Sequence, residues 1–123
     1  MNYQFTPDSV QFQIVNDDAQ LRACCERWQK VSAIALDTEF MRVSTFYPQT
    51  ALFQVAEGDS IWLIDPLPIT DWTPLREVLT SPDVIKVLHS CSEDLLVFQT
   101  CTGVLPAPLF DTQIAAAYLS EGS

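Results

Sequence analysis

An apolar run that ends in two acidic residues constrains the fold of this chain more than any other feature. Residues 32–42 read Ser-Ala-Ile-Ala-Leu-Asp-Thr-Glu-Phe-Met-Arg. Ile34, Ala35 and Leu36 leave no polar face for water, which is typical of a buried strand. Because side chains alternate along a strand, Asp37 and Glu39 should project side by side from its end.

Two interpretations of this acidic pair stay open at this point. Carboxylates held so close repel each other and resist desolvation, and a hard divalent cation between them would relieve both effects. Mg²⁺ and Mn²⁺ prefer carboxylate oxygen, so the pair is a candidate metal site. The alternative is ordinary, because Asp-x-Glu is a short pattern that often only caps a helix or solvates a loop.

Composition limits the classes of protein to consider. A chain of 123 residues makes one domain at most, and 48% hydrophobic content is typical of a globular fold. We expect no membrane span and no signal peptide, and hence a cytoplasmic protein. Six Lys and Arg against sixteen Asp and Glu argue against nucleic-acid binding by a broad basic surface. They do not exclude an enzyme that meets phosphate through metal ions.

The four cysteines predict neither a zinc site nor a disulfide framework. Cys24 and Cys25 are adjacent and no CxxC pair is present, so buried thiols are the simplest interpretation. His89 lies two residues before Cys91, which is weak support for a catalytic Cys–His pair because nearness in sequence does not establish pairing in space.

Periodicity predicts alternating helices and strands. An edge strand over 12–15 precedes an amphipathic helix that reaches residue 30, and the acidic strand follows. Strands over 50–56 and 60–64 should pair antiparallel across the turn at 57–59. A helix begins near Thr73, the expected N-cap, with Pro74 at its first position. We assign Trp28, Trp62 and Trp72 to the core.

The second half of the chain continues this alternation. A fourth strand spans 84–88, and Ser90 and Glu93 have the spacing of a capping box for the next helix. A short strand at 109–110 precedes a last helix, for which Asp111 is the expected N-cap. We therefore expect a mixed sheet covered by helices. If the strands over 32–42 and 84–88 are neighbours, Asp94 converges with Asp37 and Glu39.

These residues resemble a known family, the DEDD 3′–5′ exonucleases. Ile-Ala-Leu-Asp37-Thr-Glu39-Phe is similar to their first motif, and Lys86-Val-Leu-His89-Ser-Cys-Ser-Glu-Asp94-Leu-Leu to the second. The segments at 46–49, 52–55, 64–67, 70–72 and 110–116 resemble the ribonuclease D branch closely. The similarity runs in order over nearly the whole chain, which makes it far more specific than Asp-x-Glu alone.

The resemblance implies a fold, but the sequence also departs from the family pattern. It implies an α/β fold of ribonuclease H type, a mixed sheet flanked by helices, with residues 1–123 as a partial exonuclease domain. The third motif, with its Tyr and fourth acidic residue, is missing, because Tyr118 has Gly rather than Asp four positions later. The helical nucleic-acid-binding (HRDC) modules are missing as well. The chain would thus be C-terminally truncated, and the bare apolar surface would permit self-association.

The resemblance also implies a mechanism and a set of site residues. Two divalent ions, Mg²⁺ or Mn²⁺, would be held by Asp37, Glu39 and Asp94, with Asp37 bridging both. Thr38, Phe40 and His89 are candidate contacts to the terminal nucleotide. The alternative interpretations are core packing for Phe40 and strand-end hydrogen bonding for His89. The substrate would be the 3′ ends of tRNA precursors or other small structured RNAs. The chain as given is expected to bind metal weakly and to have little nuclease activity.

Two rival functions remain open. A DNA 3′–5′ exonuclease would use the same chemistry and would differ only around the sugar 2′-hydroxyl. A catalytically dead domain kept for nucleic-acid binding or scaffolding is favoured mildly by the missing motif and the acidic composition. The intact Asp37, Glu39 and Asp94 oppose that second rival.

Overall fold

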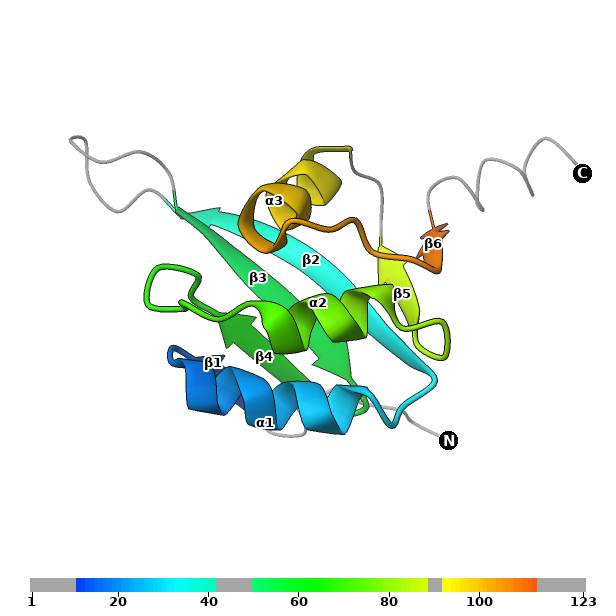
Figure 1. Ribbon diagram of the computed structural model, residues 1–123, viewed down its shortest axis with the longest axis horizontal. Helices are drawn as coiled ribbons and strands as arrows, with labels where there is room; N and C mark the ends of the chain where they lie inside the picture. The colour runs from blue at the N-terminus through cyan, green and yellow to red at the C-terminus, as the bar shows by residue number, and fades with distance from the viewer. Residues whose placement is uncertain (1–10, 42–49, 89–91, 113–123) are drawn as a thin grey trace, which may run out of the picture.

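The computed structural model describes residues 11–41, 50–88 and 92–112, and their strands and helices alternate as expected (Figure 1). Strand β1 (Gln11–Val15) precedes helix α1 (Asp18–Trp28). Strands β2 (Ala33–Met41), β3 (Thr50–Glu57) and β4 (Ser60–Ile64) follow in succession. The remaining elements are α2 (Thr73–Thr80), β5 (Ile85–Leu88), α3 (Ser92–Thr102) and β6 (Leu109–Asp111). The helix expected after Asp111 lies outside the described residues.

The described strands form one mixed sheet in the order β1-β4-β3-β2-β5-β6. As predicted, β3 and β4 pair antiparallel, and β2 joins them antiparallel on the other side of β3. Strands β2 and β5 are parallel neighbours, which confirms the condition set for Asp94 to approach the acidic pair. Strand β1 is an edge strand, also as predicted, and pairs parallel with β4.

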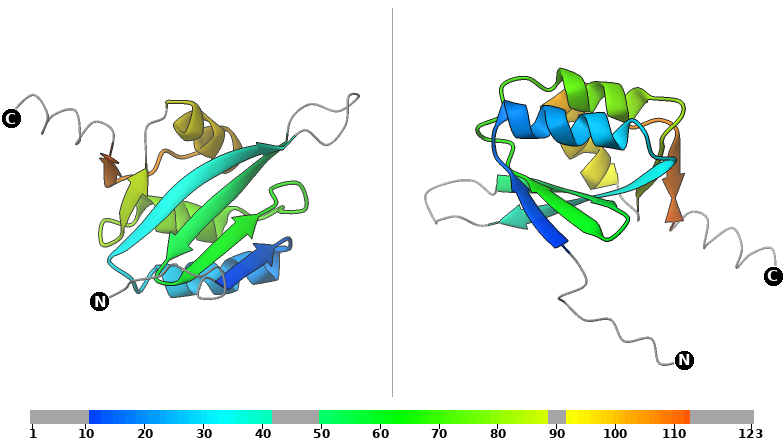
Figure 2. Two further views of the ribbon diagram at one scale, coloured as in Figure 1. Left: turned by 180° about the vertical axis from the view of Figure 1, so that it is seen from behind. Right: turned by 90° about the horizontal axis from the view of Figure 1, so that it is seen from below.

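All the described helices lie on one face of this sheet (Figure 2). Alternate strand residues point toward them, among them Ile34 and Leu36 of β2 and Phe53 and Val55 of β3, and all four are buried. The Phe53 ring stacks on Phe98 of α3, with centroids 4.7 Å apart. The core therefore lies between the sheet and a single layer of helices.

The tryptophan predictions are confirmed. Trp28 and Trp62 are buried and meet edge to face at 5.4 Å between centroids. Trp72 is half-buried and packs edge to face on Phe53. Among the described helices, none is long and apolar enough to cross a membrane.

The cap predicted for α2 is wrong. Trp72 is the N-cap and makes no side-chain cap hydrogen bond, and the helix already includes Thr73. The first helical amide is satisfied from outside, because the Thr73 N–H donates to the Asp71 carboxylate at 3.0 Å. Pro74 at the start of the helix has no N–H to satisfy, so one acceptor from the preceding loop serves this end.

A buried lysine ties β5 to two loops. The Lys86 side chain is fully buried, and its Nζ donates to the carbonyls of Ser81 at 2.7 Å, Val84 at 2.5 Å and Ala107 at 2.9 Å. The backbone N–H of the same residue donates to the carbonyl of Pro108 at 3.0 Å. Lys86 therefore holds the segment that leads into β6 against β5.

Candidate active site

The first part of the site lies on β2 just after its described pairing with the parallel neighbour β5. Among the residues that the structure describes, Leu36–Leu88 is the last β2–β5 pair, whereas the pairing of β3 with β2 extends to Met41. Asp37 is opposite Gln54 of β3, and its carboxylate accepts the Thr38 N–H at 2.8 Å. The Asp37 side chain is exposed, on the sheet face away from the helices. Its carboxylate is therefore open to a ligand from solvent.

The second part of the site comes from α3. Asp94 lies in the first turn of this helix and is only 7% exposed. The Thr38 hydroxyl donates to Asp94 Oδ1. Because α3 follows β5 and packs through Phe98 on Phe53, its first turn arrives beside the end of β2. Two stretches 56 residues apart in the sequence therefore meet at the Thr38–Asp94 hydrogen bond.

Thr38 has a contact that the sequence analysis did not foresee. Its side chain is 7% exposed, on the helix-covered face of β2, while Asp37 lies on the opposite face. This burial favours a role in orienting Asp94 over the predicted contact with a nucleotide. The signal was present in the sequence, because the residue between two residues of one face must belong to the other face.

A hollow of about 330 Å³ adjoins Asp37 on the open face of the sheet. Its floor is made of small or apolar side chains, and Gln54 and Thr112 add polar groups beside Asp37. The sequence analysis missed Gln54 and Thr112, since no local pattern tells which residues of other strands adjoin Asp37. The residues that line the hollow are Ala35, Leu36, Asp37, Gln54, Ala56, Val87 and Thr112.

The chemistry of these carboxylates fits a cation. Within the described ranges the ion pairs are Arg22–Asp71 and Arg27–Glu57, and neither involves Asp37 or Asp94. Asp94 is thus a buried carboxylate whose partner there is a hydroxyl, and such a group is stabilised by a nearby positive charge. No cluster of three or more His, Cys, Asp or Glu side chains able to hold a metal occurs among the described residues.

The side chains of three predicted site residues lie outside what the structure describes. Glu39 and Phe40 belong to β2, where Glu39 is opposite Leu52 and Phe40 opposite Ala51, but their side chains lie outside what the structure describes. His89 lies outside the described residues altogether, as does Cys91. The convergence of three carboxylates therefore stays a prediction.

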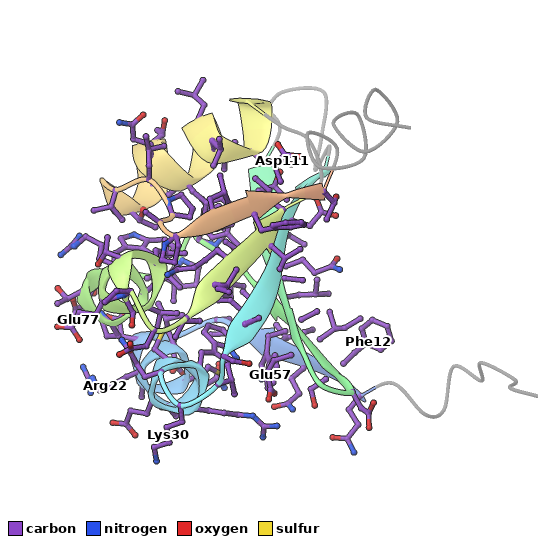
Figure 3. The ribbon with its side chains drawn as sticks, turned by 90° about the vertical axis from the view of Figure 1, so that its right-hand side faces the viewer. Phe12, Arg22, Lys30, Glu57, Glu77 and Asp111 are labelled. Carbon is purple, nitrogen blue, oxygen red and sulfur yellow. The ribbon has the colours of Figure 1, made fainter. Side chains whose placement is uncertain are left out.

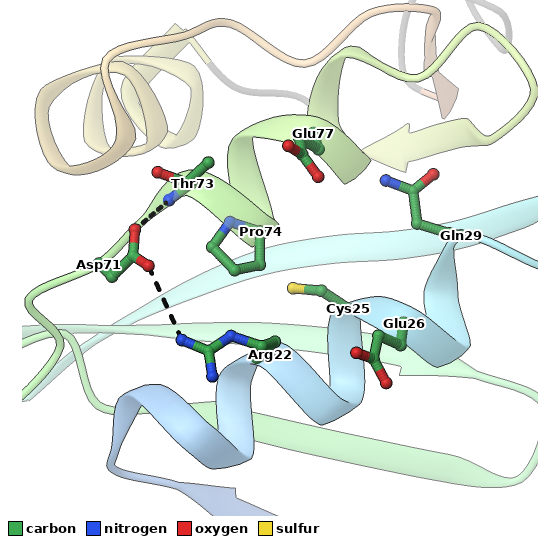
Figure 4. Close-up of a pocket in the computed structure, with 8 residues that line it drawn as sticks. All are labelled: Arg22, Cys25, Glu26, Gln29, Asp71, Thr73, Pro74 and Glu77. Carbon is green, nitrogen blue, oxygen red and sulfur yellow. Dashed lines mark hydrogen bonds and ion pairs between the residues drawn. The ribbon is translucent and has the colours of Figure 1, made fainter.

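A second groove, of about 350 Å³, lies between α1 and α2 and is separate from Asp37 and Asp94 (Figure 4). Arg22 and Asp71 form an ion pair of 3.9 Å at one end. Burial is the main factor that raises the pKa of the Cys25 thiol to about 12, ahead of the nearby Cys24 and Glu77. Cys25 therefore stays a thiol at neutral pH and is no nucleophile.

Comparison with known proteins gives consistent matches. The family profile described as 3′-5′ exonuclease matches residues 12–123. Ribonuclease D of Pseudomonas paraeruginosa is 58% identical over 109 residues, which are 89% of this chain and 29% of that protein. The crystal structure of Escherichia coli RNase D, called an exoribonuclease involved in structured RNA processing, superposes with a TM-score of 0.76 at 48% identity. The superposition covers 96% of this chain and 29% of the E. coli chain.

More distant structures share the fold. The Aedes aegypti Nibbler EXO domain has a TM-score of 0.74 at 18% identity, over 98% of this chain and 60% of that one. Trypanosoma brucei RNase D, solved in complex with RNA U12, has a TM-score of 0.69 at 19% identity, over 85% of this chain and 38% of that one. The chain spans less than a third of the length of the curated relatives named Ribonuclease D that it matches.

Proposed function

Because the chain belongs to the family of 3′-5′ exonucleases, we propose that it supplies part of the active site of a ribonuclease D-type 3′–5′ exoribonuclease. The reaction is hydrolysis of the phosphodiester bond at an RNA 3′ end. The substrate class is structured RNA such as tRNA precursors, as the E. coli relative is described as acting in structured RNA processing. We also propose a cytoplasmic location, in keeping with the free thiols of Cys24, Cys25 and Cys101.

One observation carries this proposal, the hydrogen bond from Thr38 to Asp94. It joins the two sequence motifs that the resemblance assigns to metal binding. The hydroxyl occupies one oxygen of Asp94 and so fixes the direction of the carboxylate. Asp37, one residue before Thr38, keeps an exposed carboxylate beside the hollow. Helix α3 thus supplies an acid with a fixed direction, and β2 supplies an exposed acid one residue away from the Thr38 contact.

Exonucleases of this family normally depend on divalent metal. We propose that Asp37, Glu39 and Asp94 would hold two such ions, Mg²⁺ or Mn²⁺. Bound there, the ions would activate water and neutralise charge on the phosphate. The protein's own part is to supply oxygen ligands at fixed positions. The small side chains of Ala35 and Ala56 in the floor of the hollow leave room beside Asp37 for the terminal nucleotide.

Metal binding tests the proposal directly on the 123-residue chain. Mn²⁺ titration followed by electron paramagnetic resonance should give a carboxylate site that Asp37→Asn and Asp94→Asn each weaken by about tenfold or more, since each removes a charged ligand (tenfold corresponds to about 1.4 kcal/mol). The matched control is Asp59→Asn, in the exposed turn between β3 and β4. Equal Mn²⁺ affinity for all four proteins would contradict the assignment.

Activity should be measured on the whole protein that carries this sequence. Matched RNA and DNA oligonucleotides with a labelled 5′ end should be shortened from the 3′ end only when divalent metal is added. Faster shortening of DNA than of RNA would favour a DNA exonuclease instead. Metal binding without hydrolysis of either substrate would favour the binding or scaffold role.

A further inference from the structure

Gln54 lies directly across from Asp37 in the sheet. The two residues pair in the β2–β3 ladder, so their side chains share one face. It is the face away from the helices, to which Phe12 also points in Figure 3. Directly opposite residues of an antiparallel pair have Cβ atoms about 5 Å apart. The Gln54 amide is therefore within reach of a group bound at the Asp37 carboxylate.

The Gln54 amide has a mostly apolar setting. The side chain is half-buried, and its neighbours on the same face include Leu63 of β4 and Leu52 and Ala56 of β3. None of these three side chains can form a hydrogen bond. Within the described ranges, no hydrogen bond joins the Gln54 amide to another residue. Because a carboxamide carries two donor hydrogens and an acceptor oxygen, this position favours a ligand that supplies matching groups.

The hollow beside Gln54 has the length and the chemistry for a nucleoside. Gln54 lies on β3 and Thr112 directly follows β6, so the hollow reaches over β2 and β5 between them. Three strand spacings of about 4.8 Å make it roughly 14 Å long. Its floor consists of small or apolar side chains without charge. Such a floor between two uncharged polar walls suits a sugar and a base better than a further phosphate.

We propose that Gln54 recognises the 2′-hydroxyl of the 3′-terminal ribose. The inference rests on the proposed function, which brings the scissile phosphate beside Asp37. Since the sugar is joined directly to that phosphate and the base lies farther away, the sugar is the part that reaches Gln54, one strand away from Asp37. A 2′-hydroxyl both donates and accepts a hydrogen bond, and an amide offers both counterparts. Gln54 therefore distinguishes RNA from DNA at this site.

The test uses two substrates that differ in one hydroxyl group. RNA oligonucleotides with a labelled 5′ end carry either ribose or 2′-deoxyribose at the 3′-terminal position alone. Release of that nucleotide is measured as kcat/KM on the whole protein that carries this sequence, with divalent metal added. We expect wild type to prefer the ribose end by about tenfold, as one well-placed hydrogen bond provides (about 1.4 kcal/mol).

Replacing Gln54 by methionine keeps the length of the side chain and removes its hydrogen-bonding groups. We expect Gln54→Met to lower kcat/KM for the ribose end by about tenfold and for the deoxyribose end by less than about threefold. The matched control is Gln99→Met, at an exposed position of α3, which should keep the wild-type preference. A general disturbance of the fold would lower both values together and so differs from the expected result.

Nucleotide binding gives a second readout that needs no hydrolysis. AMP and 2′-deoxy-AMP are titrated into the whole protein and followed by isothermal titration calorimetry. Wild type should bind AMP about tenfold more tightly than the deoxy form, whereas Gln54→Met should bind the two alike. Gln99→Met should again behave as wild type.

Several results would overturn the inference. One is a wild-type protein without preference for ribose. Another is an equal loss for both ends in Gln54→Met, which would place the amide at a group that both sugars share, such as the 3′-hydroxyl. If RNA is shortened and Gln54→Met keeps the ribose preference, the nuclease function stands and only the role of Gln54 is wrong. If neither shortening nor nucleotide binding occurs, the proposed function fails, and this inference fails with it.

Discussion

Replacing the buried Lys86 by methionine should destabilise the fold. The side chains have similar length, but methionine offers no donor to the three carbonyls that Nζ contacts. The Val84 contact is buried, and an unsatisfied carbonyl there costs about 1–3 kcal/mol. The Ser81 and Ala107 contacts are partly buried, so water can replace the ammonium at about 0.5–1.5 kcal/mol each. Since methionine no longer buries a charge, the net loss is smaller than these costs together, and we expect about 1–4 kcal/mol.

The shifted pKa of Lys86 also predicts how its contribution to stability changes with pH. Burial lowers the pKa of the Lys86 ammonium below its ordinary value of 10.5. Between the folded pKa and 10.5 the unfolded chain therefore binds more protons than the folded chain, and the contribution of Lys86 to stability rises with pH. The raised pKa values of Cys24, Cys25 and Cys101 act in the opposite direction above pH 9, but they act equally in both proteins.

The assay is urea unfolding followed by tryptophan fluorescence, with Lys30→Met as the control. Lys30 is exposed, so the control should change the free energy of unfolding by less than about 0.5 kcal/mol. The difference between wild type and Lys86→Met should widen as pH rises toward 10.5. A variant as stable as wild type would refute the reasoning, because it would mean that desolvation of the ammonium cancels its three hydrogen bonds.

Two further predictions concern side chains that join distant elements. Thr38→Val removes the donor to the buried Asp94 carboxylate and should lower the free energy of unfolding in urea by about 1–3 kcal/mol. Thr38→Ser keeps the hydroxyl and should retain most of the stability. Equal losses for both variants would show that the methyl group matters rather than the hydrogen bond. Asp18 accepts from the Thr70 hydroxyl, which is the main factor that lowers the Asp18 pKa below 3.8, so its stabilisation is present above that pH and is lost as pH falls through the folded pKa. The melting temperature of Asp18→Asn should therefore lie below wild type at neutral pH, with the gap closing in acid, and calorimetry showing a constant gap would contradict this.

Local patterns in the sequence were enough to predict most of the elements. The run from Ile34 to Leu36 and the helical spacing of Leu21, Cys25 and Trp28 each depend on neighbours within a few residues. The spacing of apolar residues reveals such elements well, because the apolar pattern of a strand or an amphipathic helix repeats every two to four residues. The helix–strand alternation left the pairing of β2 with β5 as a condition, and because the structure meets that condition, Asp94 approaches the acidic strand as anticipated.

Contacts between distant residues could not be predicted in this way. Lys86 interrupts an apolar strand, and nothing within a few residues of it reveals that Ala107 provides an acceptor. The α2 cap was misassigned because Thr73 is a good capping residue by type, whereas the backbone makes Trp72 the N-cap and the Asp71 carboxylate accepts the first helical N–H. Thr38 was identified as a site residue, but its partner lies 56 positions away.

The sheet order has a consequence for how the protein forms. Strands β2, β3 and β4 follow one another in the sequence and pair as a meander. Strand β1 pairs with β4, and β5 pairs with β2, although other elements separate each pair in the sequence. Contacts between near neighbours form faster than those that close long loops. During synthesis, Asp37 would then lie on an ordered hairpin before α3 delivers Asp94. The proposed site would then be assembled on a framework that already exists, with Asp94 as the later arrival.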